Sequence, residues 1–375
     1  MKINPYYTGI ISKPAQQKGQ EKWRTLPFHD LKKAEDPEGY VANDRLIQAV
    51  NVALILGRPL LLTGEPGVGK SSLAAHVAAE LGLDLIKYRV TSQTTGTDLF
   101  YKFDYLGEFR DAQSRRSVTE PEMVAKSEMI VPATTDGTSP SSDNPPAMDQ
   151  QRMRFIQFQA LGKAILLANE WETVQDLWQL GRDEFKGPAR TLVLIDEIDK
   201  APRDVPNDIL NDLEEMKFYI PQLSDKENKG NQGREVSAPK ELRPIVILTS
   251  NSEKNLPDAF LRRCVYFDIR LEKEKLPEIV ANRIKDGISK DCPLLKDCLE
   301  LFSLLRQDGS GIRKKPSTAE LLNWLHWLRS TGLAANDSLK KQKEANLLGG
   351  LSCLVKSRED WQLGEQILTK WLGQS

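Results

Sequence analysis

The sequence lacks an excess of charge of either sign. Its 52 Lys and Arg residues nearly cancel its 53 Asp and Glu residues, which leaves a formal net charge of −1. Long-range attraction to nucleic acid or to an anionic membrane needs a surplus of positive charge. The composition therefore disfavours a protein that binds nucleic acid through its overall charge.

Residues that bind metals or form disulfides are also scarce. None of the four cysteines stands in a CxxC spacing, and the chain has only three histidines to join them. We therefore expect neither a zinc site nor a disulfide framework. The cysteines are Cys264, Cys292, Cys298 and Cys353.

Long apolar segments are absent as well. No apolar run approaches the ~20 residues that cross a bilayer. The first residues, MKINPYYTGIISKPAQQKGQEKW, lack the continuous apolar core of a secretion signal. We expect a cytoplasmic protein without a membrane span, in which reducing conditions keep the thiols free.

What the chain does have is a pattern of short apolar runs between helical segments. Its 375 residues predict two or three domains. Residues 1–38 are polar and contain four prolines, which is typical of an extended N-terminal arm. In 39–271, the apolar runs predict strands buried on both faces, hence an α/β domain with a mainly parallel sheet flanked by helices. The predicted strands are 58–64, 85–92, 191–196, 245–250 and 264–271.

Two stretches interrupt this pattern, and a different pattern follows it. Residues 112–150 are dense in Ser, Thr, Pro and Asp, which predicts a mobile insertion. Residues 218–239 have two β-like ends around a charged tip that contains glycine, which predicts a protruding hairpin. After 271 the apolar residues recur with helical spacing, so we expect 272–375 to form a separate helical domain.

The segment 64–71 carries the most specific motif of the chain. It reads Gly-Glu-Pro-Gly-Val-Gly-Lys-Ser and matches G-x-x-x-x-G-K-[ST], in which backbone N–H groups close around phosphates at a helix N-terminus. We expect Lys70 to reach the β- and γ-phosphates and the Ser71 hydroxyl to bind Mg²⁺. The alternative, a glycine-rich turn without a ligand, is disfavoured because the motif stands between a predicted strand and a predicted helix. The predicted nucleotide-binding residues here are Gly64, Glu65, Pro66, Gly67, Val68, Gly69, Lys70, Ser71 and Ser72.

Two carboxylates follow a later apolar strand, in LVLIDEID at 192–199. Asp196 stands where a carboxylate can reach Mg²⁺ bound at the P-loop. Glu197 suits the residue that orients and deprotonates the attacking water. Surface carboxylates at a strand end are the alternative, which the nearby P-loop disfavours. We expect Asp199 to be structural.

Weaker signals follow the last two predicted strands. Asn251 ends the run IVILTSN and could hold the attacking water or the γ-phosphate, although an asparagine after a strand is most often only a turn residue. Arg262 and Arg263 precede the fifth strand. A guanidinium there could stabilise transition-state charge, while a surface arginine pair is the commoner explanation.

The order of these motifs resembles that of the AAA+ ATPases, and within them the MoxR-type branch. The similarity covers about 40–330 and includes DRLIQAVNVALILGRPLLLTGEPGVGKSSLA, VTSQTTGTDLFYKFD, IDEIDKAPRDVPNDILNDLEE and LPDAFLRRC. It implies an α/β nucleotide domain followed by a small helical lid, assembled as a hexameric ring with ATP between neighbouring subunits.

The resemblance also implies roles for individual residues. Lys70, Ser71, Asp196, Glu197 and Asn251 would act on the ATP of their own subunit. Arg263 aligns best with the finger that reaches the neighbour's γ-phosphate, with Arg262 as the fallback. Adenine would pack near Tyr40 and Val41. The family's insertion would correspond to 98–180 and its hairpin to 218–236.

One departure from the family pattern concerns the helical lid. Many relatives carry an arginine that senses nucleotide at the start of a lid helix, but the matching stretch 313–320 has no arginine after its proline. Arg313, Lys314 or Lys315 could take this role. The departure puts nucleotide-driven movement of the lid in question.

The leading hypothesis is a MoxR-like, ring-forming ATPase that remodels a protein partner, with a von Willebrand A domain protein as the partner that the resemblance implies. A second hypothesis is a nucleic-acid motor whose hairpin touches the backbone, although that hairpin has balanced charge. A third is a scaffold that assembles on binding ATP and turns over little.

Overall fold

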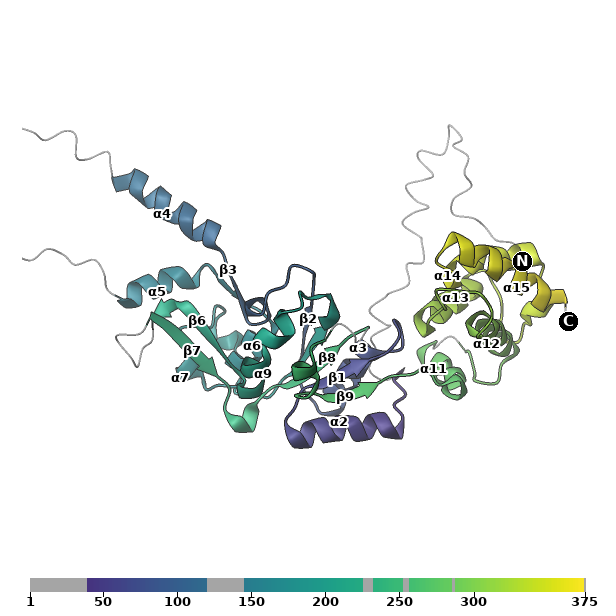
Figure 1. Cartoon of the computed structure of the whole chain (residues 1–375), viewed down its shortest axis with the longest axis horizontal. Helices are drawn as coiled ribbons and strands as arrows, with labels where there is room; N and C mark the ends of the chain where they lie inside the picture. The colour runs from purple at the N-terminus through teal and green to yellow at the C-terminus, as the bar shows by residue number, and fades with distance from the viewer. Residues whose placement is uncertain (1–38, 120–144, 225–231, 252–255, 285–286, 374–375) are drawn as a thin grey trace, which may run out of the picture. The chain divides into compact units, whose positions relative to one another are not determined.

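The computed structural model describes residues 39–119, 145–224, 232–251, 256–284 and 287–373 (Figure 1). The predicted arm 1–38, the centre of the predicted insertion and the tip of the predicted hairpin lie outside the described residues. The chain divides into two compact units. Of the described residues, the helical unit contains those within 39–48, 63–80 and 267–373, and the sheet unit contains those within 49–62 and 81–266.

The main sheet has five parallel strands in the order β2-β5-β8-β1-β9. Strand β8 pairs with β1 on one side and with β5 on the other. In parallel strands the carboxyl ends meet at one edge of the sheet. The strands are β1 (Leu60–Thr63), β2 (Leu85–Arg89), β5 (Leu192–Asp196), β8 (Ile245–Thr249) and β9 (Val265–Asp268).

The strands of this sheet form where the apolar runs predict them, and β1, β5 and β8 are buried on both faces. All four side chains of β1 are buried, as are the first four of β5. The predicted α/β fold with a parallel sheet flanked by helices is confirmed, together with the helical region that follows it. The helices of the described chain before β9 are α2 (Asp44–Leu56), α3 (Lys70–Glu80), α4 (Tyr105–Thr119), α5 (Pro145–Met153), α6 (Ala160–Leu167), α7 (Trp171–Val174), α8 (Val205–Asp208), α9 (Leu210–Glu215) and α10 (Asp258–Leu261).

Two antiparallel strand pairs extend the sheet unit. Strand β3 (Tyr101–Phe103) pairs with β4 (Ile156–Phe158), and β6 (Lys217–Ser224) pairs with β7 (Gln232–Ser237) within the predicted hairpin. Both described ends of the predicted insertion, 112–119 and 145–150, are helical. The side chain of Arg152 joins α5 to β6 by donating to the carbonyl oxygen of Gln222 at 3.0 Å.

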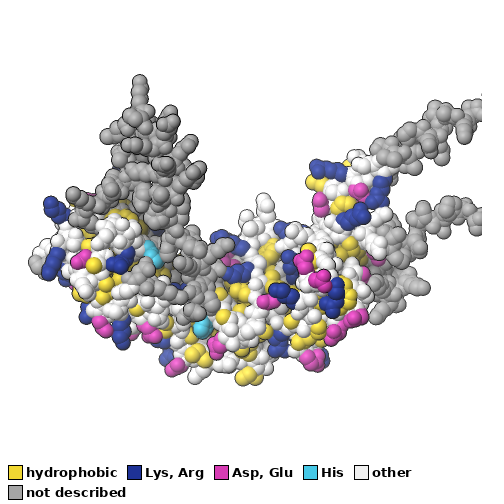
Figure 2. Space-filling model, turned by 180° about the vertical axis from the view of Figure 1, so that it is seen from behind, with side chains coloured by type: hydrophobic (Ala, Val, Ile, Leu, Met, Phe, Trp, Pro, Cys, Tyr) yellow, Lys and Arg dark blue, Asp and Glu magenta, His cyan; other side chains and the backbone are white. Residues whose placement is uncertain are grey.

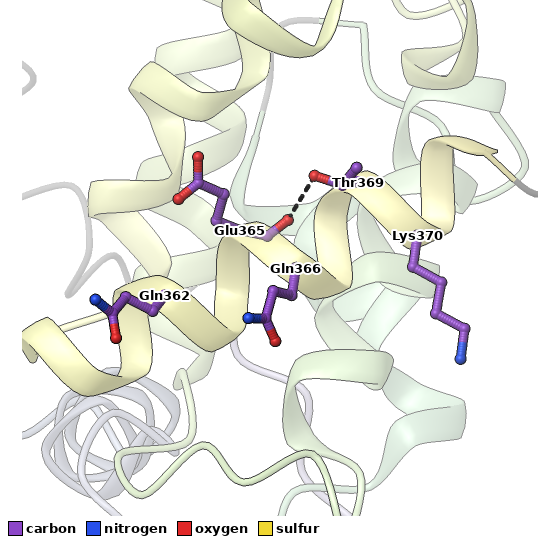
Figure 3. Close-up of a pocket in the computed structure, with 5 residues that line it drawn as sticks. All are labelled: Gln362, Glu365, Gln366, Thr369 and Lys370. Atoms are coloured by element: carbon purple, nitrogen blue, oxygen red, sulfur yellow. Dashed lines mark hydrogen bonds between the residues drawn. The ribbon is translucent and has the colours of Figure 1, made fainter.

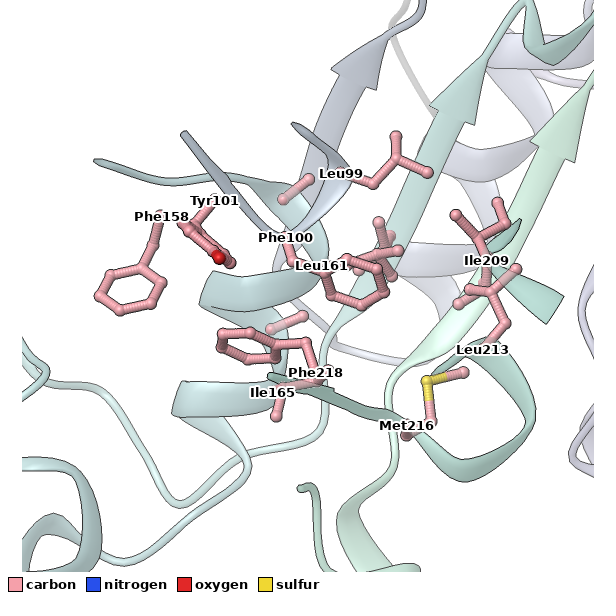
Figure 4. Packing of buried hydrophobic residues seen from close by; sticks show 14 of the residues in the cluster. Leu99, Phe100, Tyr101, Phe158, Leu161, Ile165, Ile209, Leu213, Met216 and Phe218 are labelled. Atoms are coloured by element: carbon pink, nitrogen blue, oxygen red, sulfur yellow. The ribbon is translucent and has the colours of Figure 1, made fainter. Parts of the chain in front are cut away.

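An aromatic cluster forms the core between these strand pairs (Figure 4). The ring of Phe218 lies 5.5 Å from that of Phe100, 6.1 Å from Phe158 and 6.2 Å from Tyr101, measured between ring centroids. All four side chains are almost completely buried. Because Phe218 belongs to β6 and the others to β3, β4 and the turn before β3, this cluster attaches the β6–β7 hairpin to the sheet unit.

The helical unit has a second core. Its largest side chains, Trp324 and Trp371, are each 1% exposed and pack among leucines of the surrounding helices. The helices are α11 (Leu276–Arg283), α12 (Pro293–Arg306), α13 (Thr318–Ser330), α14 (Glu344–Leu354) and α15 (Arg358–Gly373). Among the described residues, no helix is long and apolar enough to cross a bilayer.

We predict that Phe218→Ala lowers the free energy of unfolding by about 3–5 kcal/mol, because it removes a buried ring and leaves a cavity. Chemical denaturation followed by aromatic fluorescence measures the change. Phe109→Ala is the matched control, since the ring of Phe109 is 60% exposed. The control should change the value by no more than about 0.5 kcal/mol. Equal losses from the two substitutions would mean that the aromatic cluster does not hold the hairpin.

Candidate nucleotide-binding site

The loop between β1 and α3 has a backbone that only glycine adopts easily. Gly64, Gly67 and Gly69 have φ angles of 136°, 76° and 97°. These angles lie in the region that side chains of L-residues disfavour. A Cβ added at Gly64 would also lie 2.3 Å from the carbonyl oxygen of Ile269. The spacing of glycines in the motif thus follows from the path of the backbone, which turns directly into the N-terminus of α3.

Lys70, the first residue of α3, folds back over this loop. Its ammonium group donates hydrogen bonds to the carbonyl oxygens of Gly64 at 2.8 Å and of Glu65 at 3.0 Å. The side chain is buried, with 7% of the residue exposed. The positive charge is therefore held above the loop by neutral acceptors. An anionic phosphate would be a stronger acceptor for the same group.

Two residues of the helical unit approach the loop. The guanidinium of Arg306 forms an ion pair with Glu65 at 2.6 Å. A Cβ added at Gly67 would lie 2.5 Å from Oγ of Ser317, the residue before α13. Sequence reasoning missed both residues, since neither belongs to a local motif.

Tyr40 lies beside Gly69, at the C-terminal end of the loop. Its ring is 3.2 Å from the position of a Cβ at Gly69, and it packs against the ring of His76 with a centroid distance of 5.4 Å. Burial raises the pKa of the Tyr40 hydroxyl well above its usual range. Tyr40 and His76 thus form an aromatic surface beside the loop. Val41 follows Tyr40 and is half-buried.

The two predicted carboxylates belong to the sheet unit, and Thr249 at the end of β8 joins them. The Thr249 hydroxyl donates to Oδ1 of Asp196 and accepts from the backbone N–H of Glu197 at 2.9 Å. Thr249 is completely buried. This hydroxyl fixes the ends of β5 and β8 to each other. No local sequence motif indicates this role of Thr249.

Glu197 has an unusual backbone and two cationic partners. Its φ of 61° is left-handed, which costs a non-glycine residue free energy. Its carboxylate accepts hydrogen bonds from Lys200 at 2.7 Å and from Arg89 at 3.1 Å. Burial by itself raises the pKa of Glu197, but the two cations outweigh it and lower the pKa. The carboxylate is therefore ionised at neutral pH.

Asn251 is placed by Asp199. The backbone N–H of Asn251 donates to Oδ1 of Asp199 at 3.2 Å, which holds the turn after β8 beside the turn after β5. Asp196, Glu197 and Asn251 are therefore brought to one edge of the sheet unit. The side chain of Asn251 is exposed.

The two arginines before β9 differ in their surroundings. Arg263 forms an ion pair with Glu214 of α9 at 3.1 Å. Arg262 is exposed, and its carbonyl oxygen accepts a long hydrogen bond of 3.5 Å from Arg58.

The basic stretch before α13 is occupied by local contacts. The ammonium of Lys315 pairs with Asp308 at 2.6 Å. The backbone N–H groups of Arg313 and Lys314 donate to the buried carboxylate of Asp360 at 2.8 and 3.1 Å. Burial raises the pKa of Asp360, but these bonds outweigh it and keep the pKa below its usual range. The stretch thus anchors α13 to α15.

Neither the depression along α15 nor a cluster of metal-binding side chains offers a second candidate site among the described residues. A shallow depression lies along α15, and Figure 3 shows that one helix supplies every side chain that lines it. A hollow on one face of a single helix does not enclose a ligand. Within the described ranges, no group of three or more His, Cys, Asp or Glu side chains could hold a metal ion. A metal here would need ligand oxygens from a substrate, as Mg²⁺ commonly has.

Residues 59–137 match the family model of the AAA domain, dynein-related subfamily. The match begins one residue before β1 and contains the whole glycine-rich loop. It supports an AAA+ P-loop ATPase that binds a nucleotide. It does not reach Asp196 and Glu197, and it does not distinguish the MoxR-type branch, which stays a prediction.

We predict that Glu197→Gly gives a more stable protein than Glu197→Ala. Both changes remove the carboxylate, but only glycine adopts the left-handed backbone without strain. Glycine also raises the entropy of the unfolded chain, which offsets part of this gain. We expect the free energies of unfolding of the two variants to differ by about 0.5–1 kcal/mol. Chemical denaturation measures it. Lys200, in a helical turn, supplies the control pair, and there alanine should be the more stable. Greater stability of Glu197→Ala would contradict the strained backbone.

Proposed function

We propose that the protein hydrolyses ATP with Mg²⁺ at a single site formed by the P-loop and the carboxylates after β5. The main support is the glycine-rich loop itself. Its three left-handed glycines and the helix N-terminus behind them suit a phosphate group, which backbone N–H groups and the helix dipole stabilise. The AAA-domain match over the same residues agrees with this assignment.

The order of the sheet supports a common site for the two segments. Strands β1 and β5 both pair with β8 in parallel, so their carboxyl ends share one edge. The P-loop starts directly after β1, and Glu197 directly follows β5. Ligands of open parallel sheets bind at this edge.

In the proposed site, phosphate oxygens replace the loop carbonyls as acceptors for Lys70. The Ser71 hydroxyl and Asp196 would hold Mg²⁺, and Thr249 fixes the direction of the Asp196 carboxylate. The ion would neutralise charge on the β- and γ-phosphates. The backbone of Gly64 to Gly69 and of Ser72 would surround the phosphates. Tyr40 and Val41 would pack against adenine.

Glu197 would orient the attacking water and accept its proton. Arg89 and Lys200 hold the carboxylate in the structure, and hydrogen bonds to the charged form reduce its basicity. Hydrolysis would therefore require water to replace at least one of these cations. Asn251 would contact the water or the γ-phosphate from the end of β8.

For the trans-acting arginine, the surroundings favour Arg262 over Arg263. Arg263 is already paired with Glu214, whereas Arg262 is exposed. An exposed guanidinium can reach a neighbouring subunit without first losing an ion pair. This reverses the ranking that the resemblance alone implies.

The proposed assembly is a ring, hexameric as in the family resembled, which remodels a protein partner such as a von Willebrand A domain protein. The nucleic-acid alternative has less support. On the face that Figure 2 draws, Lys and Arg side chains of the described residues are interspersed with Asp and Glu. At the hairpin, Lys217 pairs with both Glu215 and Glu235. The third hypothesis, an ATP-gated scaffold, differs from the proposed remodelling ring only in its rate of ATP hydrolysis.

We predict that steady-state ATP hydrolysis per subunit rises with protein concentration and then saturates, because the active site is completed by a neighbouring subunit. Phosphate release is measured over a wide range of concentration, with Glu197→Gln as the blank. Arg262→Ala should lower the plateau by about 10³-fold if it supplies the finger. Arg263→Ala serves as its matched control and should lower it much less. Wild-type turnover no faster than the blank would leave the scaffold as the better account.

We predict that in the double variant R89A/K200A the acidic limb of the pH dependence of kcat lies at higher pH than in the wild type. The two cations lower the pKa of Glu197, so without them burial raises it, and the carboxylate becomes protonated, and inactive, at higher pH. Hydrolysis at saturating ATP is measured between about pH 4 and 8. Arg115→Ala, which removes a partner of Asp111, is the control and should leave the profile unchanged. An unmoved limb in R89A/K200A would contradict the role of Glu197 as base.

A further inference from the structure

Arg306 holds a fixed position next to the P-loop. Its Nη1 donates to the carbonyl oxygen of Pro316 at 2.6 Å, and its guanidinium carbon lies 5.8 Å from the centre of the Phe302 ring. Only 11% of its side chain is exposed. The core of the helical unit therefore places this positive charge, and the placement does not depend on Glu65.

Glu65 is the less constrained partner of the pair. Its side chain is 55% exposed, although its carboxylate lies 2.6 Å from Nη2 of Arg306. Glu65 is the second residue of the P-loop, so its negative charge stands within the loop that would receive phosphates. A carboxylate in that position repels a triphosphate and neutralises the nearest arginine. Solvation of Glu65 makes its release from Arg306 inexpensive.

A second contact brings the same part of the helical unit to the loop. Ser317, whose hydroxyl approaches Gly67, directly follows Pro316, the acceptor of Arg306. The stretch 316–317 thus connects Arg306 to the middle of the P-loop. A phosphate in the loop would lie among groups that this stretch positions.

We propose that Arg306 is a phosphate-binding residue and that Glu65 occupies its guanidinium until nucleotide arrives. The inference rests on the proposed function. When ATP enters, a phosphate oxygen replaces the Glu65 carboxylate on Nη2, and Glu65 turns to solvent. Guanidinium groups donate to phosphate oxygens as they do to carboxylate oxygens, so the exchange preserves the hydrogen bond of Nη2 and leaves Nη1 on Pro316. The helical unit thereby responds directly to the occupant of the loop.

Substitution of Glu65 has opposite effects on nucleotide affinity if Glu65 is replaced by phosphate on Arg306 and if the Glu65–Arg306 ion pair only stabilises the loop. In a structural ion pair, loss of either partner disturbs the loop and weakens nucleotide binding. In exchange, Glu65→Gln removes a competitor and tightens binding, whereas Arg306→Gln removes a ligand and weakens it. Glutamine is chosen in both cases because it retains length and polarity.

The experiment is equilibrium binding of a fluorescent ATP analogue with Mg²⁺ to the full chain. We expect Glu65→Gln to tighten binding about 3- to 10-fold and Arg306→Gln to weaken it about 10- to 100-fold, as for loss of a charge-assisted hydrogen bond. In the double variant, the benefit of Glu65→Gln should disappear, because the competitor has no arginine to occupy. Thermal unfolding checks that each variant is folded.

Asp308→Asn supplies the matched control. It breaks the neighbouring ion pair with Lys315, in which Asp308 is fully exposed, and should leave affinity unchanged. If Arg306→Gln does not fold, Glu65→Gln decides the question alone, since weaker or unchanged binding by that variant would overturn the exchange. Failure of the wild type to bind the analogue would instead refute the proposed function, so the two failures are distinguishable.

Discussion

The backbone path of the loop between β1 and α3 constrains everything around it. Three left-handed glycines turn the chain from a buried strand directly into a helix. The turn brings the loop against the carbonyl of Ile269 on one side and the hydroxyl of Ser317 on another, where no side chain fits. Because the glycines of the loop carry no side chains, residues distant in sequence can approach it there. Arg306, Ser317 and Tyr40 all do so.

Three charged residues among the candidate site residues already have partners. Lys70 is held by loop carbonyls, Glu65 by Arg306, and Glu197 by Arg89 and Lys200. These partners hold the charges in position, and each is a group that phosphate or water can replace. The arrangement favours a site in which ATP replaces existing hydrogen bonds and ion pairs of these residues.

The sequence predicts well the parts that depend on neighbouring residues. Apolar runs correctly predict the strands of the parallel sheet, most directly at β1, β5 and β8, because burial on both faces demands such runs. The spacing of Gly64, Gly67 and Gly69 likewise follows from local backbone geometry. Site roles assigned from these motifs stay predictions, because the AAA-domain match supports nucleotide binding without testing single residues.

Contacts between distant residues could not be predicted in this way. The Arg306–Glu65 pair spans 241 positions, and Thr249 and Asp196 are 53 apart. No local pattern distinguishes Arg306 from other arginines near a helix end, or Thr249 from other buried strand residues. The stretch 313–320 shows the same limit, since its basic residues contact Asp308 and Asp360, partners that no motif indicates.

The central claim is that the P-loop and Asp196 serve one Mg²⁺–ATP complex. Calorimetric titration of ATP into the wild type and Asp196→Asn, each with Mg²⁺ and with a chelator, tests it most directly. The account predicts that Mg²⁺ tightens ATP binding by the wild type at least about tenfold, and that Asp196→Asn loses most of this dependence while it still binds ATP. Full retention of the Mg²⁺ effect by Asp196→Asn would contradict a shared site.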